Sequence, residues 1–192
     1  MNELEAEIKL HDLIKNLLCI LDPEPQREGL RDTPNRMVNA WKHWTAGYDI
    51  DPDNLLKVFD DGAENYDEMV IVRNIPFYSH CEHHLAPFFG TATVAYVPKR
   101  RIVGLSKLSR VVDAFARRLQ VQERMTVQIA DCVENNLKPL GVGVFLKARH
   151  LCMESRGVRQ QGHHTETTAL RGVFRTDAAA RGEFLSRLNN GG

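Results

Sequence analysis

The sequence predicts an α+β fold, in which an antiparallel sheet carries an antiparallel pair of helices on one face and follows an N-terminal helical region. Three observations predict it. Two amphipathic helical patterns follow one another directly within residues 104–137, alternating strand patterns flank this pair, and the first 45 or so residues carry only helical patterns. Consecutive helices between strands bury their apolar stripes together on one face of a sheet. We therefore expect a helical region at residues 1–47 and a sheet domain at 48–192.

The composition is that of an ordinary globular domain. The chain has 192 residues, of which 43% are apolar and 26% charged, and its formal net charge is zero. A neutral chain has no overall field to attract nucleic acid or a membrane surface. No apolar run approaches the ~20 residues that a membrane span needs, and the acidic N-terminus lacks a signal-peptide pattern. We expect a cytoplasmic protein that binds neither nucleic acid nor membrane.

The N-terminal region is predicted to form two helices. Apolar residues recur at helical spacing from Leu10 to Leu21, and Pro23 ends the pattern. The Asp32-Thr33-Pro34 sequence predicts a second start, with Asp32 as a capping side chain and proline in the first turn. Arg36 falls in that first turn.

The sheet domain is predicted to alternate between strands and helices. The expected strands are residues 68–75, 90–97, 102–103, 141–153 and 170–174. The expected helices have apolar stripes at residues 108–119, 125–137 and 184–188, and the intervening segments 46–66 and 154–168 are expected to be loops. In the strand at 141–153, period-two alternation predicts that His150 and Cys152 project from the same face.

Two short segments carry the residue types of a metal site. Cys81 and His84 are three residues apart, so one turn can direct both at the same point. A thiolate and an imidazole are ligands that zinc favours, at about 2.3 and 2.0 Å. The best candidate for a third ligand is Cys152. The other two cysteines, Cys19 and Cys132, fall on apolar helix faces, so cysteine usage indicates metal binding in a reducing compartment.

Three ligands would leave a fourth zinc position open to water, as in catalytic sites. The alternative is a closed structural site in which His83 or His150 is the fourth ligand. If both histidines are free, they can act as general acid and base near neutral pH. Glu82 either orients one of them or is an ordinary exposed carboxylate, and the sequence does not decide between these alternatives.

A second group of residues suits a nucleotide. Lys107 and Arg110 lie one turn apart at a helix start, and a helix N-terminus with basic side chains suits a phosphate chain. Arg156 and Arg36 are further candidates. The pair Gln122-Glu123 can hydrogen-bond to a base edge, although spacing alone favours a helix N-terminal acid stabilised by the helix dipole.

Several motifs together resemble one family. They are Cys-Glu-His-His at 81–84, Gly-Leu-Ser-Lys at 104–107, Gln-Val-Gln-Glu-Arg at 120–124, His-x-Cys at 150–152 and Arg-Gly-Val at 156–158. Their order and spacing are similar to those of type I GTP cyclohydrolase, and the resemblance runs from about Leu13 to Leu188. It implies the tunnelling fold, pentameric rings stacked into a homodecamer, and active sites at subunit interfaces.

The resemblance also implies a reaction and a role for each residue. GTP and water give 7,8-dihydroneopterin triphosphate and formate, with zinc held by Cys81, His84 and Cys152. Zinc-activated water attacks C8 of guanine, while His83 and His150 act as acid and base. The implied substrate contacts are Ser106 near the ribose, Gln122 and Glu123 on guanine, and Lys107, Arg110, Arg156 and Arg36 on the triphosphate.

The sequence departs from the family pattern at two places. Asn39 stands where the family can carry a further basic residue, and His163-His164 stands where small polar residues are usual.

Two other functional hypotheses remain. One alternative is a GTP-binding regulatory relative without turnover, which would lack a ligand or a histidine. The other is reduction of a deazaguanine nitrile on the same fold, which would require a differently placed cysteine nucleophile.

Overall fold

The computed structural model describes residues 2–60 and 66–189. By contacts between residues, the chain divides into two compact units, Met1–Ala46 and Gly47–Gly192. None of the helices in the described ranges is both long enough and apolar enough to cross a lipid bilayer. We describe each unit by itself.

The first unit is a pair of helices, α1 (Glu3–Leu21) and α2 (Thr33–Thr45), joined by a short 3-10 turn, η1 (Glu28–Leu30). The helix α1 begins earlier than its apolar stripe suggests, because Asn2 and Glu5 form a reciprocal capping box. The predicted start of α2 is confirmed, with Asp32 at the N-cap position and proline in the first turn, but the Asp32 side chain makes no capping hydrogen bond. Its carboxylate instead lies 3.6 Å from the Arg36 guanidinium.

The apolar stripe of α1 is only partly buried within this unit. Ile14 and Val38 are buried, whereas Leu13 and Leu17 are more than half exposed. Cys19 is exposed as well, so its predicted place on a buried face is wrong.

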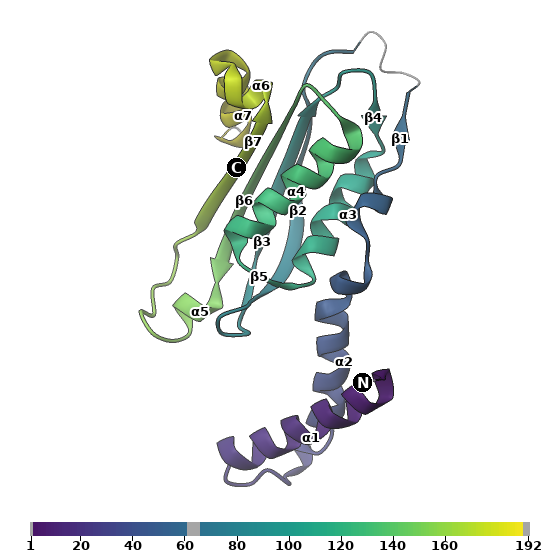
Figure 1. Cartoon of the computed structure of the whole chain (residues 1–192). Helices are drawn as coiled ribbons and strands as arrows, with labels where there is room; N and C mark the ends of the chain where they lie inside the picture. Colours follow the sequence, from purple (N-terminus) through teal and green to yellow (C-terminus); the bar gives the residue numbers. More distant parts are fainter. Residues whose placement is uncertain (1, 61–65, 190–192) are drawn as a thin grey trace. The chain divides into compact units, whose positions relative to one another are not determined.

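The second unit is built on a five-stranded sheet in the order β5-β2-β3-β6-β7 (Figure 1). Its strands are β2 (Val70–Cys81), β3 (Pro87–Val97), β5 (Leu119–Gln120), β6 (Gly141–His150) and β7 (Thr165–Gly172). All neighbouring pairs are antiparallel except β5, a two-residue strand that pairs in parallel with the end of β2. A separate small ribbon joins β1 (Val58–Phe59) to β4 (Ile102–Val103).

The predicted helix pair is confirmed. The helices α3 (Leu105–Ala116) and α4 (Gln122–Leu137) lie side by side on one face of the sheet (Figure 1), with α3 against β2 and α4 against β6 and β7. Their apolar stripes are buried on the same face as alternate residues of β3 and β6. Cys132 is buried in this core, as predicted, but Leu119 belongs to β5 rather than to the α3 stripe.

The opposite sheet face has a smaller core under the C-terminal helices α6 (Val173–Thr176) and α7 (Ala178–Asn189). Phe174 and Phe184 pack there against Ala95 of β3. Glycine at 143 in β6 makes room for this contact, since a Cβ would lie 3.0 Å from the Phe184 ring. Both faces of the central strands are therefore covered at this end of the sheet.

Three strand predictions need correction. The strand β2 continues to Cys81 instead of ending at Ile75, with a bulge between Val72 and Ile75. The strand β7 starts at Thr165, within the predicted loop. The strand β6 ends at His150, because residues Leu151–Glu154 form the one-turn helix α5.

The predicted loop at 46–66 also contains local structure. It holds two 3-10 turns, η2 (Ala46–Asp49) and η3 (Pro52–Leu55), and the strand β1; residues 61–65 lie outside the described residues.

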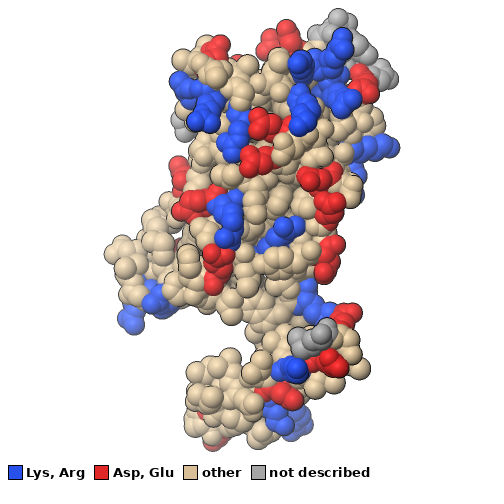
Figure 2. Space-filling model, in the orientation of Figure 1, with Lys and Arg blue, Asp and Glu red and all other residues tan. Residues whose placement is uncertain are grey.

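On the face of the sheet unit seen in Figure 2, acidic and basic side chains are interspersed, which agrees with the zero net charge.

Candidate metal centre

The site lies where β2 turns into β3. The backbone N–H of Cys81 donates to the carbonyl of Ala86 at 2.9 Å, and the N–H of Leu85 donates back to the carbonyl of Cys81 at 2.8 Å. Leu85 takes a left-handed conformation, with φ of 53°, to close this turn. A non-glycine residue pays a steric cost for that conformation. The turn therefore holds Cys81 and the three residues after it in a defined loop at one end of the sheet.

The three predicted ligands come together at this turn. The sulfur atoms of Cys81 and Cys152 and a ring nitrogen of His84 all lie within 4.8 Å of one another. Cys81 Sγ lies 3.7 Å from His84 Nδ1. A sulfur and a nitrogen bound to one zinc ion at ~2.3 and ~2.0 Å in tetrahedral geometry would be about 3.5 Å apart. The donor types and their spacing thus fit zinc, and within the described residues the cluster includes neither His83 nor His150.

Cys152 reaches the cluster from a helical turn rather than from the strand face that alternation predicted. The following Glu154 is 6% exposed. It receives two hydrogen bonds from the Arg149 guanidinium, at 3.0 and 2.5 Å. The same guanidinium lies over the Phe89 ring, 5.6 Å from its centroid. This pair fixes α5 to β3 and β6 and lowers the pKa of the Glu154 carboxyl.

His150 lies beside the cluster, at the end of β6. Its ring stacks on Phe88 with 4.6 Å between centroids and 4° between planes. Its Nε2 lies 2.7 Å from Oε1 of Gln122. Burial lowers the pKa of the His150 imidazole, and the nearby Glu123 carboxylate partly opposes that shift. Burial thus favours the neutral form of an imidazole whose orientation is fixed by Phe88 and Gln122.

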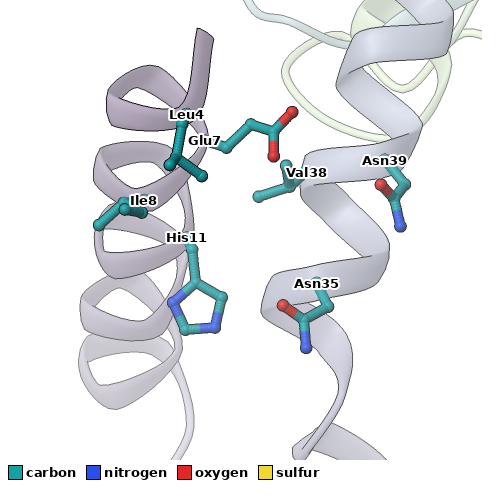
Figure 3. A pocket seen from close by; sticks show the side chains of 7 residues that line it. All are labelled: Leu4, Glu7, Ile8, His11, Asn35, Val38 and Asn39. Carbon is teal, nitrogen blue, oxygen red and sulfur yellow. The ribbon is translucent and has the colours of Figure 1, made fainter. Parts of the chain in front are cut away.

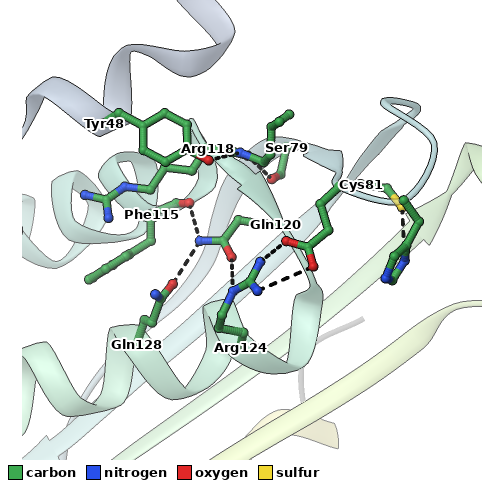
Figure 4. A network of polar contacts seen from close by, with 11 residues as sticks. Tyr48, Ser79, Cys81, Phe115, Arg118, Gln120, Arg124 and Gln128 are labelled. Atoms are coloured by element: carbon green, nitrogen blue, oxygen red, sulfur yellow. Dashed lines mark hydrogen bonds and ion pairs between the residues drawn. The ribbon is translucent and has the colours of Figure 1, made fainter.

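His83 and Glu82 take different directions from the turn. His83 is exposed, and its Nδ1 lies 3.8 Å from Cys81 Sγ. The Glu82 carboxylate pairs with the Arg124 guanidinium, which also contacts Gln120 (Figure 4). That pairing lowers the pKa of the Glu82 carboxyl.

The predicted nucleotide residues separate into two groups. Arg156 is close to the cluster, with its Nη1 3.1 Å from Nε2 of His84, and Glu123 is exposed in the first turn of α4. Ser106, Lys107 and Arg110 lie in the first turns of α3 instead.

The start of α3 lies at the other end of the sheet from the metal cluster. It follows β4, whose Val103 donates its N–H to the Tyr96 hydroxyl, and Tyr96 pairs with Val70 at the start of β2. Cys81 ends β2, and a strand of this length spans ~35 Å. A single chain therefore does not bring Ser106 or Lys107 to Cys81.

Arg36 and Asn39 belong to the helical unit. Asn39 lines a pocket of about 320 Å³ between α1 and α2, together with Leu4, Glu7, Ile8, His11, Asn35 and Val38 (Figure 3). Of the two unusual histidines, His163 is half-buried and close enough to His150 to lower the pKa of that imidazole, whereas His164 is exposed.

Sequence reasoning missed several residues that support the site. Phe88 stacks on His150, and the Arg149–Glu154 pair anchors α5. Thr126 and Thr167 share a hydrogen bond of 2.7 Å beside Gln122. No local pattern could have found the threonine pair, because α4 and β7 meet only in the tertiary structure.

Comparisons with known proteins agree with this geometry. The family model described as GTP cyclohydrolase I matches residues 10–189. The chain is 60% identical over 171 residues to GTP cyclohydrolase 1 of Janthinobacterium sp. (strain Marseille), covering 89% of this chain and 86% of that protein. It is 54% identical to GTP cyclohydrolase 1 of Nitrosospira multiformis, with 97% of each chain covered. With 95% of this chain and 99% of the relative covered, it is 49% identical to GTP cyclohydrolase 1 of Leptospira biflexa. The chain therefore belongs to the GTP cyclohydrolase I family.

Proposed function

We propose that this chain hydrolyses and rearranges GTP to 7,8-dihydroneopterin triphosphate, with release of formate. The observation that carries the proposal is the cluster of Cys81, His84 and Cys152 within 4.8 Å, beside an oriented His150, in a member of this family. The non-catalytic alternative predicts a missing ligand or histidine, and none is missing from this chain.

The metal of the proposed site is zinc. Two thiolates and an imidazole are a donor set that zinc favours, and three protein ligands leave a position for water or substrate. When bound, zinc acts as a Lewis acid and makes water nucleophilic at neutral pH, which suits addition of water to C8 of guanine.

The proposed roles of the side chains follow from where they lie. His83 lies beside Cys81, and His150 is two residues from Cys152, so one can protonate a ring nitrogen of guanine while the other removes a proton. Glu123 is exposed at the start of α4, near His150, and its carboxylate can accept hydrogen bonds from the guanine N1–H and amino group. Arg156 can bind the triphosphate from the metal side.

The proposed enzyme is a homo-oligomer, with the decamer of two stacked pentamers as the expected form. Support comes from the distance between Ser106, Lys107 and Arg110 and the metal cluster within one chain. If those residues contact the ribose and triphosphate, a second copy must supply them. We further propose that residues 48–192 are the catalytic domain and that residues 1–47 are a helical attachment carrying Arg36. We also propose that the protein is cytoplasmic, because free cysteines are typical of a reducing compartment.

The test combines metal content with turnover. Purified protein is expected to contain zinc and to convert GTP to formate and a pterin that fluoresces after oxidation. Cys152→Ser should lose both zinc and turnover. His150→Ala should retain zinc but lose ~10²-fold or more in kcat, the usual contribution of a general acid or base. Retained zinc in Cys152→Ser together with lost zinc in His150→Ala would contradict this division of roles.

A further inference from the structure

The carboxamide of Gln122 is a buried polar group whose orientation is determined by its neighbours. Gln122 is 1% exposed. Its Nε2 lies 3.0 Å from the carbonyl oxygen of Thr165 and 3.3 Å from that of Leu146. Carbonyl oxygens can only accept, so the amide nitrogen must face them and the amide oxygen must face away. The backbones of β6 and β7 therefore set the direction of this side chain.

The orientation of Gln122 determines which nitrogen of His150 carries the proton. The Gln122 Oε1 lies 2.7 Å from His150 Nε2, and an amide oxygen can only accept. His150 Nε2 must therefore donate, which leaves Nδ1 unprotonated in the neutral ring. Among the residues that the structure describes, none hydrogen-bonds to Nδ1. The Phe88 stack fixes the plane of the same ring.

Two threonine hydroxyls close a ring of hydrogen bonds around Gln122. Thr126 Oγ1 donates to the backbone carbonyl of Gln122 at 2.7 Å, so it must accept the proton of Thr167 Oγ1, 2.7 Å away. Thr167 Oγ1 in turn accepts from Gln122 Nε2 at 3.1 Å. Each hydroxyl has one proton, so only one direction around the ring satisfies every group.

We propose that Gln122 is a positioning residue for His150, which it holds as the Nε2–H tautomer so that Nδ1 is the atom that takes up and returns a proton. The role of Nδ1 in proton transfer rests on the proposed function, whereas the assignment of the Nε2–H tautomer does not. This role differs from contact with guanine. The donors of Gln122 are already used inside the protein, and a purine could engage them only if they left the carbonyls of β6 and β7.

The first test separates positioning from nucleobase recognition. In the zinc-loaded Gln122→Met variant, kcat should fall by ~10²-fold, a typical cost of a misplaced catalytic group. The KM for GTP of the same zinc-loaded variant should stay within about twofold of wild type, since positioning contributes only in the transition state. A KM that rises tenfold or more with kcat unchanged would overturn the proposal.

The second test reads the tautomer directly and does not depend on turnover. Wild-type zinc-loaded protein labelled with ¹⁵N in its histidine rings is expected to show His150 as a single Nε2–H form, with signals assigned by their absence in His150→Asn. In Gln122→Met the two tautomers should become mixed. An Nδ1–H form in the wild type would overturn the proposal even if no Gln122 variant folds.

A matched control separates tautomer control from the loss of a buried amide. Gln120 is 2% exposed and also donates to a backbone carbonyl, that of Phe115, at 2.9 Å. Gln120→Met should lower the Tm, as Gln122→Met does, but leave the His150 signals unchanged. An equal change of those signals in both variants would overturn the specific role of Gln122. If wild type fails to turn over GTP but shows the Nε2–H form, the proposed function fails and the tautomer stands.

Discussion

The sulfur of Cys81, the last residue of β2, and the sulfur of Cys152, in the turn α5 that follows β6, lie within 4.8 Å of each other although they are far apart in the sequence. The strand β3 brings them together: it lies between β2 and β6 and is antiparallel to both, so the C-terminal ends of β2 and β6 lie at the same end of the sheet. The register is explicit, since His80 pairs with Pro87 and Phe88 pairs with His150. A close pair of free thiols at one edge is a property that chemical labelling can measure.

Thiol labelling should distinguish the four cysteines. At pH 8 a small alkylating reagent should modify exposed Cys19 in the zinc-loaded protein, while Cys81 and Cys152 are protected by the metal. After chelation, those two should become reactive as well. Cys132 should stay unmodified, because burial raises its pKa to about 12 and keeps the thiol protonated at pH 8.

Peptide mass mapping after each treatment checks this order. Alkylation of unfolded protein, which should modify all four residues, is the control for reagent activity. Equal labelling of Cys81 before and after chelation would contradict its role as a ligand.

Removing the Glu154 carboxylate should loosen the metal. Glu154→Gln retains the shape of the side chain but loses the charge that anchors α5 to Arg149. Because residues that orient a ligand typically contribute about tenfold in metal affinity, we expect zinc to be lost to a competing chelator at about tenfold lower chelator concentration. The matched control is Glu166→Gln, which breaks the exposed pair with Lys147 on neighbouring strands and should leave zinc affinity unchanged.

The Glu82–Arg124 pair allows a test of whether Glu82 orients His83 or only pairs with Arg124. If Arg124 is the partner that matters, the double variant should lower the Tm by less than the sum of the losses in Glu82→Gln and Arg124→Met, because both single changes remove the same ion pair. Differential scanning calorimetry measures this. If Glu82 instead orients His83, Glu82→Gln should reduce kcat strongly while Arg124→Met does not.

Base recognition by Glu123 should appear as a change in nucleotide preference. Inosine triphosphate lacks the amino group of guanine, so a site that uses the Glu123 carboxylate should prefer GTP. Glu123→Gln should reduce the ratio of kcat/KM for GTP over ITP by about tenfold to a hundredfold, the range expected for a charge-assisted hydrogen bond. Glu134→Gln, on the same helix, should leave the ratio unchanged; a loss of preference in that control would point to a general effect on α4.

The sequence predicted the parts of this protein that depend on local patterns. The stripes of α3 and α4, the buried Cys132 and the alternation of β6 up to His150 follow from periodicities within single segments. The ligand types were also evident, since a cysteine and histidines recur together at 81–84 and 150–152. Chemistry that resides in residue identity can be predicted without coordinates.

Only the tertiary structure decided the rest. The strand β2 runs on to Cys81 because β3 pairs with it, and Cys152 turns into α5 because Arg149 anchors Glu154. The contacts of Gln122 come from β6 and β7, and the separation of Lys107 from the metal cluster follows from the length of the sheet. Each of these depends on segments that meet only when the chain is folded. Contacts between distant segments produce no residue periodicity within either segment, so the sequence pattern does not reveal them.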